Sequence, residues 1–294
     1  MLFAALLLAS LLPAPGLLAI AHAAEADSDG LETVLIMDVA GSVTIDPSGA
    51  VAEVKIDTPL IPSLQSSVER TVRLWRFKPV LIDGSARQVS TGMAIVLVAT
   101  AVGQDYRVKI DSVHFSAGKG QVVARGDGDK EQISAGTLAP PKYSHDAQMA
   151  NMNGAILLAI RVRPDGKVGE VSAVQSMLYE VPSHRGSLRR GLASLEATAV
   201  DCARHWTFNV PADAATRSPE QMTVTVPVDF NLGYQFDVPG QWFKVMRLPR
   251  RPIGWLPATA SDAQLGLASV GVSGVSPLAS AFQLSQEVAG TPLL

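Results

Sequence analysis

The sequence carries one pattern twice, and this repeat constrains the fold more than any other feature. Residues 45–51 (IDPSGAV) resemble residues 162–168 (VRPDGKV), and each stretch places a proline and a glycine between two apolar segments. That composition is typical of the tight turn in a β-hairpin. Further along, residues 75–79 (WRFKP) resemble residues 206–211 (WTFNVP). The sequence therefore predicts an internal repeat of one supersecondary unit.

The first copy has the pattern of a hairpin, a helix and a strand. Residues 34–44 and 51–56 are rich in apolar and β-branched side chains and predict the two hairpin strands. We expect a helix to follow, with Ser63 as its N-cap. Its apolar face is predicted from residues that recur about every four positions, namely Leu64, Val68, Val72 and Trp75. Residues 93–99 are strongly apolar and predict the closing strand.

The second copy repeats this order over a longer stretch. Residues 155–162 and 168–174 predict the hairpin strands, and an apolar series from about Leu192 to Trp206 predicts the helix. Residues 223–232 alternate apolar with more polar side chains, as a strand with one buried face does. The same three elements are therefore expected in both copies.

We expect an α+β fold made of two small domains. Each domain should be an antiparallel sheet of about three strands with one packed helix. The predicted domains cover residues 31–102 and 140–233, and residues 103–139 are expected to form connecting strands or a hairpin. Residues 234–294 lack Lys and Arg after Arg251 and show no sustained period, so they predict a linker and a disordered tail.

Two aromatic pairs follow the predicted helices, where each helix meets the next strand. Trp75 and Phe77 belong to the first copy, and Trp206 and Phe208 belong to the second. A helix packed on a small sheet needs large apolar side chains there, and an aromatic residue buries about 150–250 Å². We therefore interpret these four residues as structural anchors of the core rather than as ligand contacts.

The amino-terminal segment predicts export. Residues 1–23 carry no charged side chain, are mostly apolar, and end in a small-x-small cleavage pattern, Ala-His-Ala. We expect a signal peptide at residues 1–23 and a mature protein in the periplasm. Pro13 and Pro15 disfavour an uncleaved inner-membrane anchor. No other stretch has the length and apolar character of a transmembrane helix, so no membrane span is expected after cleavage.

Composition and missing motifs exclude several kinds of function. A formal net charge of −3 gives no electrostatic reason to expect a nucleic acid partner. Cys202 is the single cysteine, which excludes an intrachain disulfide and a cysteine-rich metal site. The histidines lack metal-ligand spacing, and the sequence contains no nucleophile elbow and no phosphate-binding glycine loop. We predict no catalytic residue, no metal site and no cofactor, and expect a protein that is not an enzyme.

The second copy resembles the C-terminal domain of TonB proteins, the energy transducers of the Gram-negative envelope. The motifs that carry the resemblance are, in chain order, Pro141-x-Tyr143 with Ala147, Gly154, Asp165-Gly166, Ser176, Trp206-x-Phe208 and residues 224–232 (VTVPVDFNL). The first copy shares only the turn, the W-x-F-x-P motif and the flanking strands. We interpret it as a second, diverged copy of the same domain.

The last strand of the second copy is where the resemblance implies binding. In the family this strand pairs with a short peptide from an outer-membrane receptor, which adds to the sheet by β-augmentation. Pro227 supports an edge position or a bulge, because proline cannot donate to a central ladder. The predicted partner-binding residues of this edge strand are Thr223, Val224, Thr225, Val226, Val228 and Asp229. The competing interpretation is an edge covered by the tail or by the other copy.

Two departures from the family bear on energy transduction. A working TonB has an anchor helix with a Ser and a His one turn apart, whereas Ser10 and His22 lie twelve residues apart here. The long proline-rich spacer is also absent. We therefore predict a periplasmic TonB-like interaction protein linked to outer-membrane receptors and transport. The alternative is an envelope scaffold or assembly factor without energy transduction, and a homodimer stays open.

Overall fold

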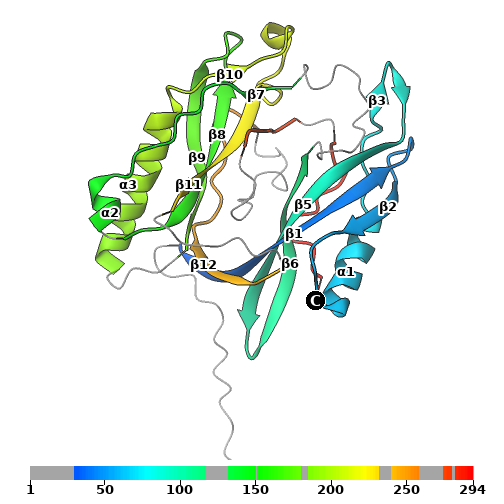
Figure 1. The fold of residues 1–294 in the computed structure, drawn as a ribbon, viewed down its shortest axis with the longest axis horizontal. Coiled ribbons are helices and arrows are strands. Elements are labelled where there is room, and N and C mark those ends of the chain that lie inside the picture. Colours follow the sequence, from blue (N-terminus) through cyan, green and yellow to red (C-terminus); the bar gives the residue numbers. More distant parts are fainter. Residues whose placement is uncertain are drawn as a thin grey trace, which may run out of the picture.

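The computed structural model of the chain describes residues 30–116, 132–149, 151–179, 185–231, 240–257, 274–279 and 282–293. The predicted signal peptide at residues 1–23 lies outside these ranges. The fold is α+β, with one large antiparallel sheet and few helices (Figure 1). Its nine strands follow the order β13-β11-β8-β9-β12-β1-β5-β6, with β2 paired to β1.

The first half of the sheet contains the predicted hairpin, helix and strand. Strand β1 (Glu32–Ile45) pairs with β2 (Val51–Ile56) on one side and with β5 (Val89–Val102) on the other. Strand β6 (Asp105–Ser116) continues the sheet beyond β5. Helix α1 (Pro62–Arg73) buries its apolar face, which consists of Leu64, Val68 and Val72.

Helix α1 begins one residue before the predicted cap. Its N-cap is Ile61, which makes no side-chain capping hydrogen bond, and Pro62 occupies the first helical turn. Proline fits there because its fixed φ suits a helix and its missing N–H would have no partner. The prediction of Ser63 as the N-cap is therefore wrong, because the proline starts the helix rather than delaying it.

The second half of the sheet has the same order of elements. Strand β8 (Gly154–Val162) lies between β9 (Val168–Leu178) and β11 (Thr223–Phe230). Helix α3 (Arg185–Ala203) connects β9 to β11, and the short helix α2 (His145–Met149) packs against α3. Helices α2 and α3 lie at one end of the molecule, and α1 lies at the other (Figure 1).

Strand β12 (Phe243–Arg247) joins the two halves and corrects the predicted arrangement. It pairs with β1 from Glu32↔Arg247 to Ile36↔Phe243, and with β9 at Met246↔Leu178. The two separate three-stranded sheets of the prediction are therefore one continuous sheet. The sequence reading missed this because β12 lies in the segment that it assigned to a linker.

Short elements complete the described fold. Strands β3 (Leu81–Ile82) and β4 (Ser85–Ala86) form a small hairpin. Strand β7 (Ser134–Ala135) pairs with β10 (Phe208–Asn209), which ties the segment before β8 to the end of the second W-x-F motif. A single 3₁₀ turn follows at Ala214–Thr216.

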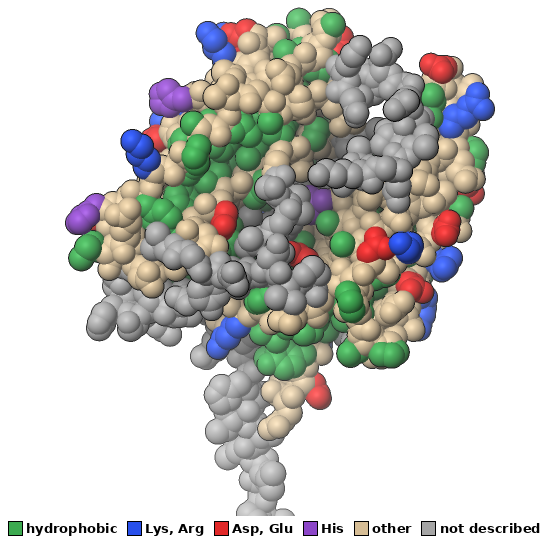
Figure 2. Space-filling view, in the orientation of Figure 1, with side chains coloured by type: hydrophobic (Ala, Val, Ile, Leu, Met, Phe, Trp, Pro, Cys, Tyr) green, Lys and Arg blue, Asp and Glu red, His purple; other side chains and the backbone are tan. Residues whose placement is uncertain are grey.

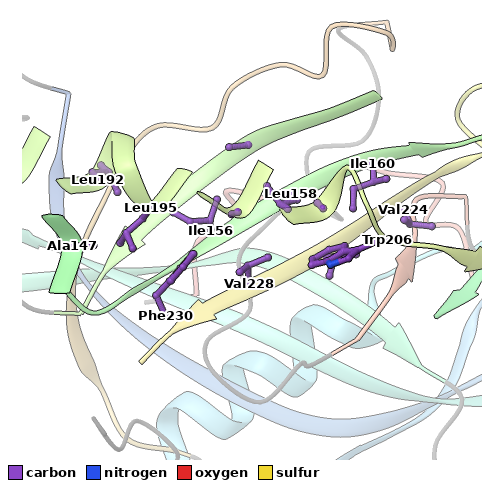
Figure 3. Packing of buried hydrophobic residues seen from close by; sticks show 14 of the residues in the cluster. Ala147, Ile156, Leu158, Ile160, Leu192, Leu195, Trp206, Val224, Val228 and Phe230 are labelled. Atoms are coloured by element: carbon purple, nitrogen blue, oxygen red, sulfur yellow. The ribbon is translucent and has the colours of Figure 1, made fainter. Parts of the chain in front are cut away.

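The sheet buries apolar side chains on both faces. One cluster lies under α3 and includes Ile156, Leu158 and Ile160 of β8 (Figure 3). A second lies under α1. A third cluster takes the alternate residues of the same strands, such as Val34 and Ile36 of β1, and therefore lies on the face opposite the helices. Both faces of the central strands are thus buried, which accounts for their continuous apolar runs.

The described parts of the C-terminal segment are packed, in contrast to the predicted disordered tail. Strand β13 (Ser276–Pro277) pairs with β11, at one end of the sheet. Phe282 and Val288 belong to the cluster under α1. Near the other end of the sheet, the N–H of Leu293 donates to the carbonyl oxygen of Val108 in β6 over 2.9 Å. The segment was misread because its side chains bury without a regular period.

Candidate binding edge at strand β11

The pairing of β11 defines which of its backbone groups face outward. On its inner side β11 runs antiparallel to β8, from Thr223↔Arg161 to Phe230↔Gly154. On its outer side the N–H of Leu278 donates to the carbonyl oxygen of Thr223 over 2.9 Å. Because alternate residues of a strand direct their backbone groups to opposite sides, Thr225, Pro227 and Asp229 also face outward.

Part of the predicted guest-binding edge is already occupied. Strand β13 pairs in the register Val224↔Pro277 and Thr225↔Ser276. The predicted binding residues Thr223, Val224 and Thr225 are therefore covered by the chain's own C-terminal segment. Within the described ranges, the pairing with β13 stops before Val226, and no other strand lies along Val226, Val228 and Asp229 on that side.

Two prolines limit what this edge can accept. Pro227 faces outward on β11, so the uncovered part of the edge lacks one N–H donor. Pro277 lies opposite Val224, in a pair whose backbone groups face away from each other, so the nitrogen of Pro277 faces away from β11. Proline at such positions ends a ladder without leaving a donor unpaired. The expectation of Pro227 at an edge fits this geometry, since the β8–β11 register has no bulge.

On one face of β11, the side chains pack into the hydrophobic core. Val224, Val226 and Val228 are buried in the cluster that packs under α3, together with Phe230. Figure 3 shows Val224, Val228 and Phe230 beside Trp206 and the β8 residues of this cluster. A guest at this edge would therefore be aligned by backbone hydrogen bonds to the outer side of β11. Figure 2 shows hydrophobic side chains gathered on the visible face over this half of the molecule.

Asp229 is the predicted edge residue with an exposed side chain and a polar contact. Its carboxylate accepts a hydrogen bond from the hydroxyl of Tyr179 over 2.7 Å. The residue as a whole is exposed, but partial burial of the carboxylate raises the pKa of Asp229 above its ordinary value and outweighs the hydrogen bond from Tyr179, which lowers it. Burial, with the nearby charge of Asp229, also raises the pKa of Tyr143 to about 12. This contact links the end of β11, across β8, to the residue that follows β9.

The other face of the β11–β13 junction forms an apolar site. Leu278 is buried there and belongs to the same cluster as Ile253 and Trp255. The indole Nε1 of Trp255 donates to the hydroxyl of Thr223 over 3.0 Å. Thr223 thus contacts the C-terminal segment through its carbonyl and Trp255 through its side chain. Trp255 lies in the segment that was predicted to be a linker and a tail, and its sequence gave no sign of this role.

The four predicted anchors are buried and occupy equivalent places in the two halves. Trp75 and Trp206 each follow a helix, and Phe77 and Phe208 each return to the hairpin turn. The N–H of Phe77 donates to the carbonyl of Gly49, and the N–H of Phe208 donates to that of Gly166, both over 2.8 Å. In each half, therefore, the W-x-F motif closes the hairpin turn.

The closing strand of the first half offers no comparable edge. Strand β5 corresponds to β11 in the order of elements, and β6 pairs along it from Gly92↔Ser116 to Val102↔Asp105. This long intramolecular ladder occupies the side on which a guest strand would add. The only candidate edge of this type in the described chain is that of β11.

A buried ionic cluster lies where β12 joins the first half. Arg247 donates to Asp111 over 2.7 Å and to Glu32 over 2.5 Å, and Arg250 donates to Asp111 over 2.6 Å. Burial opposes the charge of Asp111, but the two guanidinium groups outweigh it and lower the pKa of that carboxyl. The sequence did not predict this cluster, because Arg247 and Arg250 lie in the segment that was predicted to be a linker and a tail.

Comparison with known proteins places the family match in the first half. Residues 35–96 match the model of the Gram-negative bacterial TonB protein C-terminal family. The match begins in β1 and ends in β5, so it covers the copy that we expected to be diverged, and it does not extend to residues 140–233. It supports a TonB-like protein of the cell envelope. No curated protein and no solved structure matched the chain.

Two kinds of feature are absent from the described residues. No helix within them has both the length and the apolar character needed to cross a membrane. They also contain no group of three or more His, Cys, Asp or Glu side chains placed to hold a metal ion.

Proposed function

We propose that the protein is a periplasmic, TonB-like interaction protein, without enzymatic activity, that binds partner peptides by β-augmentation at β11. The expected partners are envelope proteins, including peptides of outer-membrane receptors. The observation that carries the proposal is the pairing of β13 with β11, because an antiparallel segment already adds to this edge in cis. The TonB family match supports the class of protein.

We also propose that residues 140–233 form a second, diverged copy of the family domain. Three observations support this. The order of hairpin, helix and closing strand is the same as in residues 35–96, and the closing strand pairs with the first strand in both halves. Gly49 and Gly166 both have positive φ, at 87° and 78°. Each accepts the hydrogen bond of the phenylalanine in a W-x-F motif.

An envelope scaffold without energy transduction is the second candidate, and a different observation favours it. The outer side of β5 is closed by β6, and part of β11 is closed by β13. A sheet that covers its own edges is suited to holding a shape rather than to capturing strands. Under this proposal the fold would present loops or helices to its partners.

A titration of the isotope-labelled full chain separates the two. Unlabelled peptides that correspond to receptor segments would be added while backbone amide resonances are followed. The first proposal expects chemical-shift changes concentrated in residues 223–229 and in β13, with none for a scrambled peptide. Shifts confined to other surfaces, or no shifts at saturating peptide, would leave the scaffold as the better proposal.

A further inference from the structure

We infer that residues 275–278 (Val-Ser-Pro-Leu) occupy the guest position on β11 and define the class of peptide that can replace them. This inference rests on the proposed function, and it names the partner chemistry of the same edge. The guest is an antiparallel segment with a large aliphatic residue opposite Thr223 and a small polar residue opposite Thr225. It tolerates proline opposite Val224.

The backbone geometry sets the direction and the place of the proline. Leu278 donates its N–H to Thr223, and the register continues through Ser276 opposite Thr225. In this alternation the residues opposite Thr223 and Thr225 must each carry an N–H. The residue opposite Val224 directs its nitrogen away from β11, so Pro277 costs no hydrogen bond there. A guest with proline at either neighbouring position would lose a ladder bond.

The side chains set the aliphatic requirement. Leu278 is 4% exposed and enters the apolar cluster that also contains Ile253 and Trp255. Ser276 lies on the same face, opposite Thr225, where little room remains because Thr225 is itself buried. Val275 packs against the cluster under α3 on the other face. A guest therefore needs a branched aliphatic side chain at one position and apolar character three residues before it.

The contact between β13 and β11 is short, which allows a guest peptide to replace β13. Strand β13 comprises only Ser276 and Pro277, whereas the following residues are held separately on the first half of the molecule. The N–H of Lys78 donates to the carbonyl of Gln283, and the N–H of Ser285 donates to that of Arg76. Residues 275–278 can therefore leave β11 while the later contacts of the C-terminal segment persist.

The test uses the full chain and a fluorescent peptide with the sequence of residues 274–279 (GVSPLA). In one variant, V224C and P277C are combined with C202A, so that a disulfide can lock β13 to β11. A non-hydrogen-bonded antiparallel pair suits such a bond because its Cα atoms are close. In a second variant, S276P removes the N–H that faces Thr225 and releases β13 without substituting a buried side chain.

Fluorescence anisotropy should show about tenfold tighter binding to the released variant than to the wild type, because a larger fraction of its edge is open. The oxidised locked variant should not bind the peptide, and reduction should restore binding. A peptide with Leu278→Asp should bind no variant. Circular dichroism melts of each variant check that the fold is retained.

The outcomes distinguish a failure of the assignment of β13 to the guest position from a failure of the proposed function. Equal binding of the peptide to the oxidised and reduced locked variant would overturn the assignment of β13 to the guest position. Receptor-derived peptides that still bind the reduced protein would then leave the proposed function standing. If neither GVSPLA nor receptor-derived peptides bind the released variant, the proposed function fails as well.

Discussion

The backbone N–H of Leu278 donates a 2.9 Å hydrogen bond to the carbonyl oxygen of Thr223. The C-terminal segment therefore contacts the outer side of β11 at Thr223, the first residue of that strand. In the strand order of the sheet, most strands lie between β11 and the strands beside which Phe282 packs under α1. One short segment therefore covers a strand edge in the second half and fills part of the core in the first half. Its sequence gave no periodic signal for either role.

The first prediction concerns the packing of this segment. Phe282 is buried beside Phe115, with ring centroids 6.4 Å apart. Phe282→Ala should lower the free energy of unfolding by about 3–5 kcal/mol, because it leaves a cavity under α1. Chemical denaturation provides the measurement, with exposed Gln286→Ala as the matched control. Equal stabilities of the two variants would mean that the segment does not pack in solution.

A second prediction compares the two anchor tryptophans. The indole Nε1 of Trp206 donates to the carbonyl of Ala139 over 2.7 Å, whereas that of Trp75 is buried without a partner in the described chain. Trp→Phe should therefore cost about 1 kcal/mol more at Trp206 than at Trp75, which is the net value of one hydrogen bond. Urea unfolding of both variants measures the difference. A larger loss at Trp75 would contradict the assigned contacts.

The hairpin turns lead to a third prediction. Gly49 has a φ of 87°, and a Cβ atom added there would lie 2.1 Å from the carbonyl oxygen of Phe77. Gly84 also has a positive φ, at 72°, but a Cβ atom would meet nothing within 4 Å. Gly84→Ala should cost about 1–2 kcal/mol from the left-handed backbone alone.

Gly49→Ala should cost clearly more than Gly84→Ala, because the added methyl group must also push the W-x-F segment away from the turn. Gly166→Ala tests the same relationship in the second half, where the Cβ atom would lie 2.4 Å from the carbonyl oxygen of Phe208. Thermal and urea unfolding of the three variants gives the order. Similar costs at Gly49 and Gly84 would show that the turn and the motif are not in contact.

The sequence predicted most of the local structure but not how the halves combine. Turn glycines and helical spacing depend on neighbouring residues, so the hairpins, α1, α3 and the closing strands could all be read in order. The pairing of β12 with β1 joins residues about 210 positions apart, and its pairing with β9 joins residues about 70 apart, and no local pattern encodes such partners. The single continuous sheet was missed for this reason.

The same limit applies to the candidate site, where local features could be predicted from the sequence but contacts between distant segments could not. Pro227 indicated an edge because a proline lacks a donor wherever it lies. The occupant of that edge could not be read, because Ser276 and Pro277 are neither β-branched nor alternating. Asp111 and Arg247 were also missed, since a buried ion pair between distant segments looks like ordinary surface charge in a sequence.

The ionic cluster at the junction gives a fourth prediction. Asp111 and Arg247 are both buried, and Arg250 shares the same carboxylate. Asp111→Asn should destabilise the fold by about 3–5 kcal/mol, because it removes the buried carboxylate charge that the guanidinium groups of Arg247 and Arg250 share. Asp105→Asn, at an exposed position of the same strand, provides the control. Calorimetry or urea unfolding near neutral pH gives the comparison.

The same carboxylate predicts a pH dependence. The pKa of Asp111 is lower in the folded protein than its ordinary value. Its stabilising contribution is therefore complete above the unfolded pKa of about 3.9 and is lost as the pH falls through the lower folded pKa. The wild type should lose this contribution on acidification, and Asp111→Asn should lack it. Parallel slopes for the two proteins below about pH 4 would contradict the lowered pKa.

The last prediction concerns the missing donor on the outer edge of β11. Pro227 faces outward beyond the end of β13, so Pro227→Ala should restore an N–H at the one uncovered position between Thr225 and Asp229. An open edge with an additional donor is a template for another strand. Analytical ultracentrifugation should therefore detect stronger self-association, and the GVSPLA peptide should bind more tightly. Pro47→Ala, at an exposed hairpin turn, makes the same chemical change away from the edge and should leave both measurements unchanged. If the two variants behave alike, a missing donor does not limit strand addition at β11, and its closure must depend on the C-terminal segment alone.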